Sequence, residues 1–402
     1  MSSILSFRTS AAPALALLCA ITAGCAAQRP VPYAPEAPKA KRLTLEEARA
    51  LDTTSLPTHK VDLLGHAISV EGIQQPQVKV ELDDAGAQAA TMIVPIAAGR
   101  PPVICFANEH FRSFGATMRV FFTGILKEHP MRVAAQELSL QGDAAHPLVR
   151  FDAVFTTEDK AAAPFQVVFA PLAARSAMCV LEGLAYHDTL LRISKEALFP
   201  LSDLEPKAVY AELKLIRMNK MPIGFEWSRL FDRGNGQYGY QSMSGTFGLA
   251  REGLLFHDSL HEARIDERGL LTRAETQTLD NNGKSASVLE RTTKGGIYTR
   301  FVGGREQKTE IAQMPTSDLE DARIYRKVAK GDKKTATPTF PDGEGKILPI
   351  VVSREGEKTL LLKYKEEVTR CELDDDGRCS RKTSGDLVRE RISTTGTFPK
   401  LP

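Results

Sequence analysis

The sequence predicts an α+β protein in two parts: an N-terminal antiparallel-sheet α/β sandwich and a C-terminal part that is mostly an antiparallel β meander or half-barrel. Three observations support this prediction. Residues 1–202 hold 37 charged side chains, whereas residues 203–402 hold 65. The first part mixes helical and strand-like periodicities, and the second repeats strand-like runs between glycine-containing turns. A chain of 402 residues is also long enough for two or three separate cores.

The overall composition excludes several classes of protein. The chain has 52 Lys and Arg against 50 Asp and Glu, a formal net charge of +2. This balance gives no global field for nucleic acid, so no nucleic-acid partner is expected. Beyond residue 24, no apolar run reaches the roughly 18 residues that span a bilayer, which excludes a polytopic membrane protein.

Residues 1–24 have the pattern of an export signal. Arg8 precedes an Ala- and Leu-rich run over 11–23, which is the length of a signal core. The run ends in Ile21-Thr22-Ala23-Gly24-Cys25, which resembles a bacterial lipobox, although Thr22 replaces the usual Leu, Val or Ile. The resemblance implies that Cys25 carries lipid and that the protein is an outer membrane lipoprotein facing the periplasm. The alternative is a secretory signal cleaved after Gly24, which leaves Cys25 unmodified.

Residues 25–57 are predicted to be the anchor, a tether and a short helix. Four prolines between residues 30 and 38 favour an extended chain, in which 17 residues span about 50 Å. Thr44 and Glu47 form a capping-box pattern that predicts a helix ending near Leu51.

Residues 58–205 are predicted to form the α+β domain. Strand patterns occur over 78–82, 91–96, 103–106, 149–156, 166–169 and 177–186. Helical spacing links Phe111, Phe114, Met118, Phe121, Phe122 and Ile125. Asp188 is expected to cap a last helix with a buried stripe of Leu190, Leu191, Ile193 and Leu198. This order is similar to that of PsbP/Mog1-like α/β sandwiches, in which helices cover one face of an antiparallel sheet.

Residues 206–402 are predicted to be mainly β. Asn235-Gly236 and Asn282-Gly283 predict two-residue hairpins. Strand-like runs cover 223–231, 238–249, 254–265, 271–278, 286–292 and 297–302, and further strands follow a linker over 330–346, around Val351, 360–364 and 365–372. These strands are expected to form a curved sheet with one solvated face.

The start and end of this meander resemble known envelope proteins. Met221-Pro222-Ile223-Gly224 opens it, and a late strand reads Lys-Tyr-Lys-Glu-Glu-Val over 363–368. The layout resembles the half-barrel sheets of LolA/LolB-like and DUF3108-like envelope proteins. The resemblance implies an apolar concave face that holds a lipid. Candidate ligand-binding residues are Phe225, Trp227, Tyr238 and Tyr240. Phe225 and Trp227 alternate with Phe231 along one strand, so core packing is the favoured interpretation of these three residues and lining a lipid cavity is the alternative.

Four cysteines remain after the signal and the proposed lipid site are set aside. They are Cys105, Cys179, Cys371 and Cys379. An even number in an oxidising compartment indicates disulfides, and three pairings are possible. Pairing within each predicted domain gives Cys371–Cys379 and Cys105–Cys179. Zinc is the alternative, but the chain has no Cys-x-x-Cys motif.

The remaining motifs favour structural roles. The GxGxxG match over 234–239 precedes strand-like residues, so we interpret it as a hairpin turn and not as a nucleotide loop. His257 and His261 would lie about 13 Å apart on one strand, too far for a shared metal. Asp374-Asp375-Asp376-Gly377 is typical of a turn, not of a calcium loop. We therefore expect no catalytic residue, no metal and no cofactor.

Three functions are compatible with these patterns. The favoured hypothesis is a membrane-anchored envelope lipoprotein without catalytic activity that binds a lipid-like or apolar ligand. The second is a structural or assembly factor that binds another envelope protein through its edge strands. The third, less favoured, is an uncharacterised hydrolase.

Overall fold

A computed structural model describes most of the chain after residue 54. The described residues are 55–82, 86–109, 113–119, 122, 131–157, 162–172, 175–183, 186–203, 206–250, 253–332, 334–342 and 345–399. The predicted signal, Cys25, the tether and the short helix predicted to end near Leu51 all lie outside this part of the chain.

The predicted α+β class is wrong, because the protein is mostly β. Strands account for 60% of the structure and helices for 12%. The strands form antiparallel sheets of two, seven and fourteen members. The prediction missed the hairpin at residues 58–71 and the long strand at 131–142, whose polar side chains weaken the hydrophobic signal of a strand.

The chain divides into two compact units. Unit 1 comprises residues 1–136, 150–204 and 249–254, and unit 2 comprises 137–149, 205–248 and 255–402. The segment at 137–149 therefore packs with unit 2, although most of its sequence neighbours belong to unit 1.

The smaller sheets lie early in the chain. β1 and β2 form a hairpin, and the seven-stranded sheet has the order β3-β4-β5-β9-β8-β7-β6. The strands are β1 (Thr58–Leu63), β2 (His66–Glu71), β3 (Gln77–Leu82), β4 (Gln88–Val94), β5 (Val103–Asn108), β6 (Met131–Gly142), β7 (Pro147–Thr157), β8 (Ala162–Ala170) and β9 (Ser176–Glu182).

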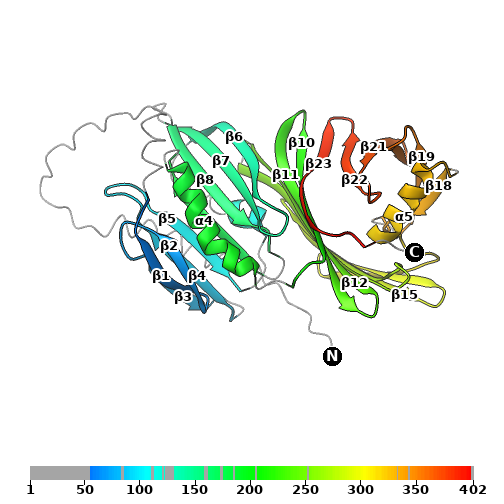
Figure 1. The fold of residues 1–402 in the computed structure, drawn as a ribbon, viewed down its shortest axis with the longest axis horizontal. Coiled ribbons are helices and arrows are strands. Elements are labelled where there is room, and N and C mark those ends of the chain that lie inside the picture. The colour runs from blue at the N-terminus through cyan, green and yellow to red at the C-terminus, as the bar shows by residue number, and fades with distance from the viewer. Residues whose placement is uncertain are drawn as a thin grey trace, which may run out of the picture. The chain divides into compact units, whose positions relative to one another are not determined.

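Helix α4 (His187–Ser202) covers this sheet and also contacts β2 (Figure 1). The predicted residues Leu190, Ile193 and Leu198 are buried. The predicted cap is wrong: Asp188 lies in the first turn, and the N-cap is Tyr186, which makes no capping hydrogen bond through its side chain.

The helix predicted from aromatic spacing falls partly outside the described residues. Residues 114–119 and 122 are helical. Phe114, Met118 and Phe122 are buried, and Phe114 stacks on Phe169 with 4.4 Å between ring centroids. The apolar spacing therefore identified residues of the unit 1 core.

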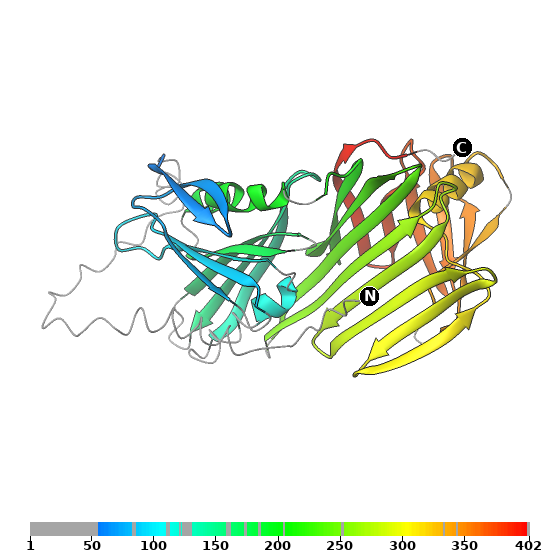
Figure 2. The ribbon, with the colours of Figure 1, turned by 90° about the horizontal axis from the view of Figure 1, so that it is seen from below.

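Unit 2 is built on one fourteen-stranded sheet (Figures 1 and 2). Its strands are β10 (Tyr210–Met218), β11 (Met221–Gly234), β12 (Gln237–Ala250), β13 (Gly253–Ile265), β14 (Leu271–Asp280), β15 (Gly283–Thr292), β16 (Gly295–Val302), β17 (Arg305–Ile311), β18 (Thr335–Pro338), β19 (Pro349–Arg354), β20 (Thr359–Tyr364), β21 (Glu367–Leu373), β22 (Cys379–Ser384) and β23 (Leu387–Gly396).

The path of the chain explains the two edges of this sheet. From β10 the strands follow one another outward to the edge at β17. Helix α5 (Asp318–Ala329) then leads to the other edge at β18, and the strands return to β23, which pairs with β10. The first and last strands of unit 2 thus meet in the middle of the sheet.

The hairpin predictions are correct at one site and displaced at another. Asn235 and Gly236 have φ values of 55° and 73° and join β11 to β12, as predicted. In the next case Asp280 pairs with Gly283, so the turn residues are Asn281 and Asn282, one position earlier than predicted. The side chain of Asn281 holds this turn against β13, because its Oδ1 accepts a hydrogen bond from the backbone N–H of Phe256.

Helix α5 was not predicted from the sequence, and the sheet curves around it. Leu319 and Ala322 share a core with Tyr210 and Leu230. Tyr325 and Val328 pack with residues of β19–β22. Since these contacts reach both halves of the sheet, α5 lies on its concave side, which we call the inner face.

Candidate functional site

A cavity of about 420 Å³ lies beside the N-terminal half of α5. We call it the α5 cavity. Its lining comes from α5, from the segment before α5, from β18 and from residues at the ends of other strands: Leu270, Arg291, Thr292, Gly295, Ala312, Gln313, Met314, Pro315, Thr316, Glu320, Ile324, Ala336, Thr337 and Pro338. The volume lies within the range of roughly 300–1,000 Å³ that is usual for small-molecule sites.

One wall of the α5 cavity carries charge. Arg291 lies 3.4 Å from the carboxylate of Asp266. Glu320 lies 3.8 Å from Arg323, and burial raises the pKa of Glu320 although Arg323 acts against this rise. The cavity therefore combines apolar surface with a few groups that could orient a polar end of a ligand.

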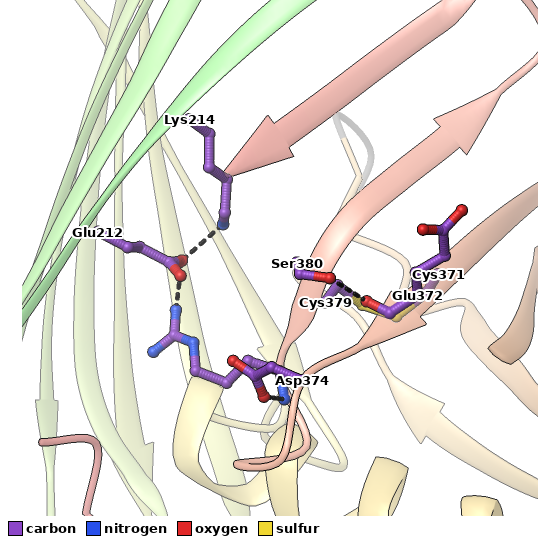
Figure 3. The surroundings of a disulfide bond; sticks show 8 residues. Glu212, Lys214, Cys371, Glu372, Asp374, Cys379 and Ser380 are labelled. Carbon is purple, nitrogen blue, oxygen red and sulfur yellow. Dashed lines mark hydrogen bonds and ion pairs between the residues drawn. A yellow bond between two sulfur atoms is a disulfide. The ribbon is translucent and has the colours of Figure 1, made fainter. Parts of the chain in front are cut away.

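A second feature is a buried group of charges on the inner face, which we call the Glu212 cluster. Glu212 is fully buried, and its carboxylate lies 2.6 Å from Lys214 (Figure 3). The same carboxylate lies 2.5 Å from Arg378 and 3.1 Å from Arg391. Tyr210 and Ser228 also donate hydrogen bonds to it. Three cations thus converge on one carboxylate.

The electrostatics of the Glu212 cluster follow from these contacts. Burial alone would raise the pKa of Glu212, but Lys214, Arg378 and Arg391 outweigh it and hold that pKa well below its usual value. Burial would lower the pKa of Lys214, and the carboxylates of Glu226 and Glu212 raise it instead. The cluster is therefore fully ionised at neutral pH.

Arg378 of the Glu212 cluster lies in the hairpin between β21 and β22, which the Cys371–Cys379 disulfide closes. The predicted turn at 374–377 is present, with Gly377 at a φ of 75°. Asp374 accepts the backbone N–H of Arg378 and also bonds Arg391 at 2.6 Å. The turn that we interpreted as structural therefore also positions two members of a charge network.

Both predicted disulfides are confirmed. Cys105 and Cys179 lie opposite each other on β5 and β9, and Cys371 and Cys379 join β21 to β22. All four residues are buried.

Part of the inner face over β10–β12 is polar, whereas the resemblance implied an apolar concave face. Strand alternation and register place Glu226, Ser228, Ser242 and Ser244 on the same face as Glu212. On the same inner face, Tyr210 and Leu230 belong to the core that packs against α5. The inner face over these strands is thus partly polar and partly apolar.

The four predicted ligand-binding residues do not share one surface. Phe225 and Trp227 are buried on the outer face, where the indole N–H of Trp227 donates to the carbonyl of Ala144 at 2.8 Å. Tyr238 and Tyr240 lie on the inner face against the core around Leu230. None of the four lines the α5 cavity.

The histidine motif lies on a strand, as assumed in the prediction. His257 is 3.9 Å from Asp280, and His261 bonds Thr276 at 2.9 Å. Burial lowers the pKa of His261. Within the part of the chain that the structure describes, no group of three or more His, Cys, Asp or Glu residues has the arrangement of a metal site.

Sequence reasoning missed the α5 cavity and the Glu212 cluster. One signal was available for the cavity: Ser317 and Glu320 form a capping box after Met314-Pro315. The Ser317 side chain does accept the backbone N–H of Glu320. No local signal exists for the cluster, because Arg378 and Arg391 lie 166 and 179 residues from Glu212.

Comparison with known proteins gives limited similarity. Sequence searches find no matching family profile and no match among curated proteins. A DUF1089 family protein from Pseudomonas aeruginosa has 14% identity and a TM-score of 0.29, covering 42% of this chain and 92% of its own. A β-barrel-like protein of domain of unknown function DUF1849 from Brucella abortus has 11% identity and a TM-score of 0.31, covering 47% of this chain and 98% of its own. At these values neither similarity supports a functional argument.

Among the described residues, no helix has both the length and the apolar composition needed to cross a bilayer.

Proposed function

We propose that this protein is a non-catalytic lipoprotein of the bacterial envelope that binds a lipid-like or apolar ligand in the α5 cavity. The observation that carries the proposal is the cavity itself, about 420 Å³ in volume and lined by Leu270, Met314 and Ile324 among others. Its apolar residues suit a hydrocarbon chain, and Arg291 and Glu320 suit a polar end.

Binding in the α5 cavity can be tested with a substitution whose larger side chain fills the cavity. Ala312 is an exposed residue of the lining, so a tryptophan there should occupy the cavity without disturbing the core. We expect Ala312→Trp to weaken binding of a fluorescent fatty-acid analogue at least about tenfold, which corresponds to roughly 1.4 kcal/mol. Ala98→Trp, at an exposed alanine of unit 1, is the matched control. Equal affinity in the two variants would contradict the proposed site.

The anchor is tested separately at Cys25. A lipobox cysteine carries more than one acyl chain, and two chains hold a protein stably at a membrane. Cys25→Ser should therefore move the protein from the membrane fraction to the soluble periplasmic fraction. Retention of the variant in the membrane fraction would exclude Cys25 as the anchor.

A partner-binding role is the second candidate, and one observation favours it. β3 is an edge strand of the seven-stranded sheet, with Val80 49% and Leu82 70% exposed. An exposed apolar edge strand is suited to pairing with a strand of another protein. The edge at β17 is less suited, since its exposed residues include Arg305, Glu306 and Lys308.

A further inference from the structure

Lys382 on β22 lies on the same face as the Glu212 cluster, and it has no direct partner among the residues that the structure describes. In register it lies opposite Cys371 on β21 and Arg389 on β23, and β23 in turn pairs with β10, which carries Lys214. Lys214, Lys382 and Arg389 therefore share the inner face of three neighbouring strands. The side chain of Lys382 is partly buried.

The other cations of this face are already engaged with carboxylates. Lys214 contacts both Glu212 and Glu226, the latter at 2.9 Å. Arg389 is half-exposed and lies 3.9 Å from Glu226. Lys382 makes no hydrogen bond or ion pair within the described residues. An ammonium group has three N–H donors, so this face has more N–H donors than acceptors in direct contact with them.

The acidic groups that face Lys382 act only at longer range. They are Glu226 from β11 and Asp318 and Asp321 from α5. Burial and the neighbouring Lys214 lower the pKa of Lys382. Burial also raises the pKa of Asp321 to about 7, despite its hydrogen bond from Thr316, so this carboxylate is only partly ionised at neutral pH.

The charge on this part of the inner face is therefore not balanced by direct pairs. Five cations occupy it: Lys214, Arg378, Lys382, Arg389 and Arg391. The carboxylates in direct contact with them are three, those of Glu212, Glu226 and Asp374. A partly buried lysine beside a second lysine gains most from an added anion, because that anion would pair with both.

We propose that Lys382, Lys214 and Arg389 form a binding site for a phosphate group. A phosphate presents several oxygens in a tetrahedral arrangement, which suits donors on the same face of three neighbouring strands, whereas a planar carboxylate offers only two oxygens. The site is separate from the α5 cavity, whose lining includes none of these residues. The phosphate is either a free anion or the head group of an amphiphile.

The first experiment is a calorimetric titration of the whole protein with inorganic phosphate. We expect saturable binding that weakens at least about tenfold in Lys382→Gln, as for the loss of one charge-assisted hydrogen bond. Lys363→Gln is the matched control, since Lys363 is exposed on the opposite face of β20. Thermal unfolding verifies that each variant folds, and Arg389→Gln replaces Lys382→Gln if the latter does not.

Two results would overturn the site. One is that the wild-type protein shows no saturable binding up to about 10 mM phosphate, because a dissociation constant above this concentration is too weak for a specific site. The other is equal affinity in Lys382→Gln and the wild type.

A second titration distinguishes the two sources of phosphate. Monododecyl phosphate that binds at least about tenfold tighter than inorganic phosphate, with both weakened in Lys382→Gln, supports a head-group site. Equal affinities that are weakened in the same variant support a site for the free anion. Ala312→Trp should leave inorganic phosphate binding unchanged, so failure of the α5 cavity proposal does not affect this result.

Discussion

Replacing Glu212 by glutamine is expected to lower the unfolding temperature of unit 2 by about 10 °C. The change keeps the size of the side chain but removes the one carboxylate that Lys214, Arg378 and Arg391 share. Removing one partner of a buried ion pair costs about 3–5 kcal/mol. For a unit of this size, each 1 kcal/mol corresponds to roughly 2–4 °C.

Calorimetry on the whole protein measures this change, with Glu310→Gln as the control. Glu310 is an exposed residue of the edge strand β17. An exposed substitution of this kind should alter stability by no more than about 0.5 kcal/mol. Similar unfolding temperatures for the two variants would mean that the Glu212 cluster does not stabilise unit 2.

Loss of the Cys105–Cys179 disulfide is the other change with a large expected effect. The two cysteines are 74 residues apart, whereas Cys371 and Cys379 are 8 apart. Closing the longer loop removes more conformational freedom from the unfolded chain, and the predicted contributions are about 4.5 and about 2.5 kcal/mol respectively.

Urea unfolding of the two double alanine variants tests this order. Cys105→Ala/Cys179→Ala should lower the free energy of unfolding of unit 1 by more than Cys371→Ala/Cys379→Ala lowers that of unit 2. A larger loss for the shorter loop would show that chain entropy in the unfolded state does not determine the ranking.

The sequence predicts local features of this fold well where the backbone preference of one or two residues determines the structure. Asn235 and Gly236 adopt positive φ values, and a hairpin follows directly. Both disulfides could be assigned because each pair lies within one predicted domain. The displaced turn at Asn281 shows the limit, since Gly283 has positive φ but is the first residue of β15 and not part of the turn.

Long-range features could not be predicted in the same way. The α+β class was wrong partly because strands such as β6 alternate weakly. The Glu212 cluster depends on the pairing of β10 with β23, which brings residues about 180 positions apart into contact. No periodicity in a single sequence reports such a contact. Which face of the sheet an aromatic residue occupies is likewise a long-range property. Phe225 and Trp227 are buried on the outer face, as expected from core packing.

The most direct test of ligand binding is native mass spectrometry of the exported Cys25→Ser protein, purified from periplasm without detergent. We expect a bound mass of lipid size that is absent when Ala312→Trp is added and retained when Ala98→Trp is added. A protein mass without ligand, or a bound mass that persists in the Ala312→Trp variant, would contradict binding in the α5 cavity.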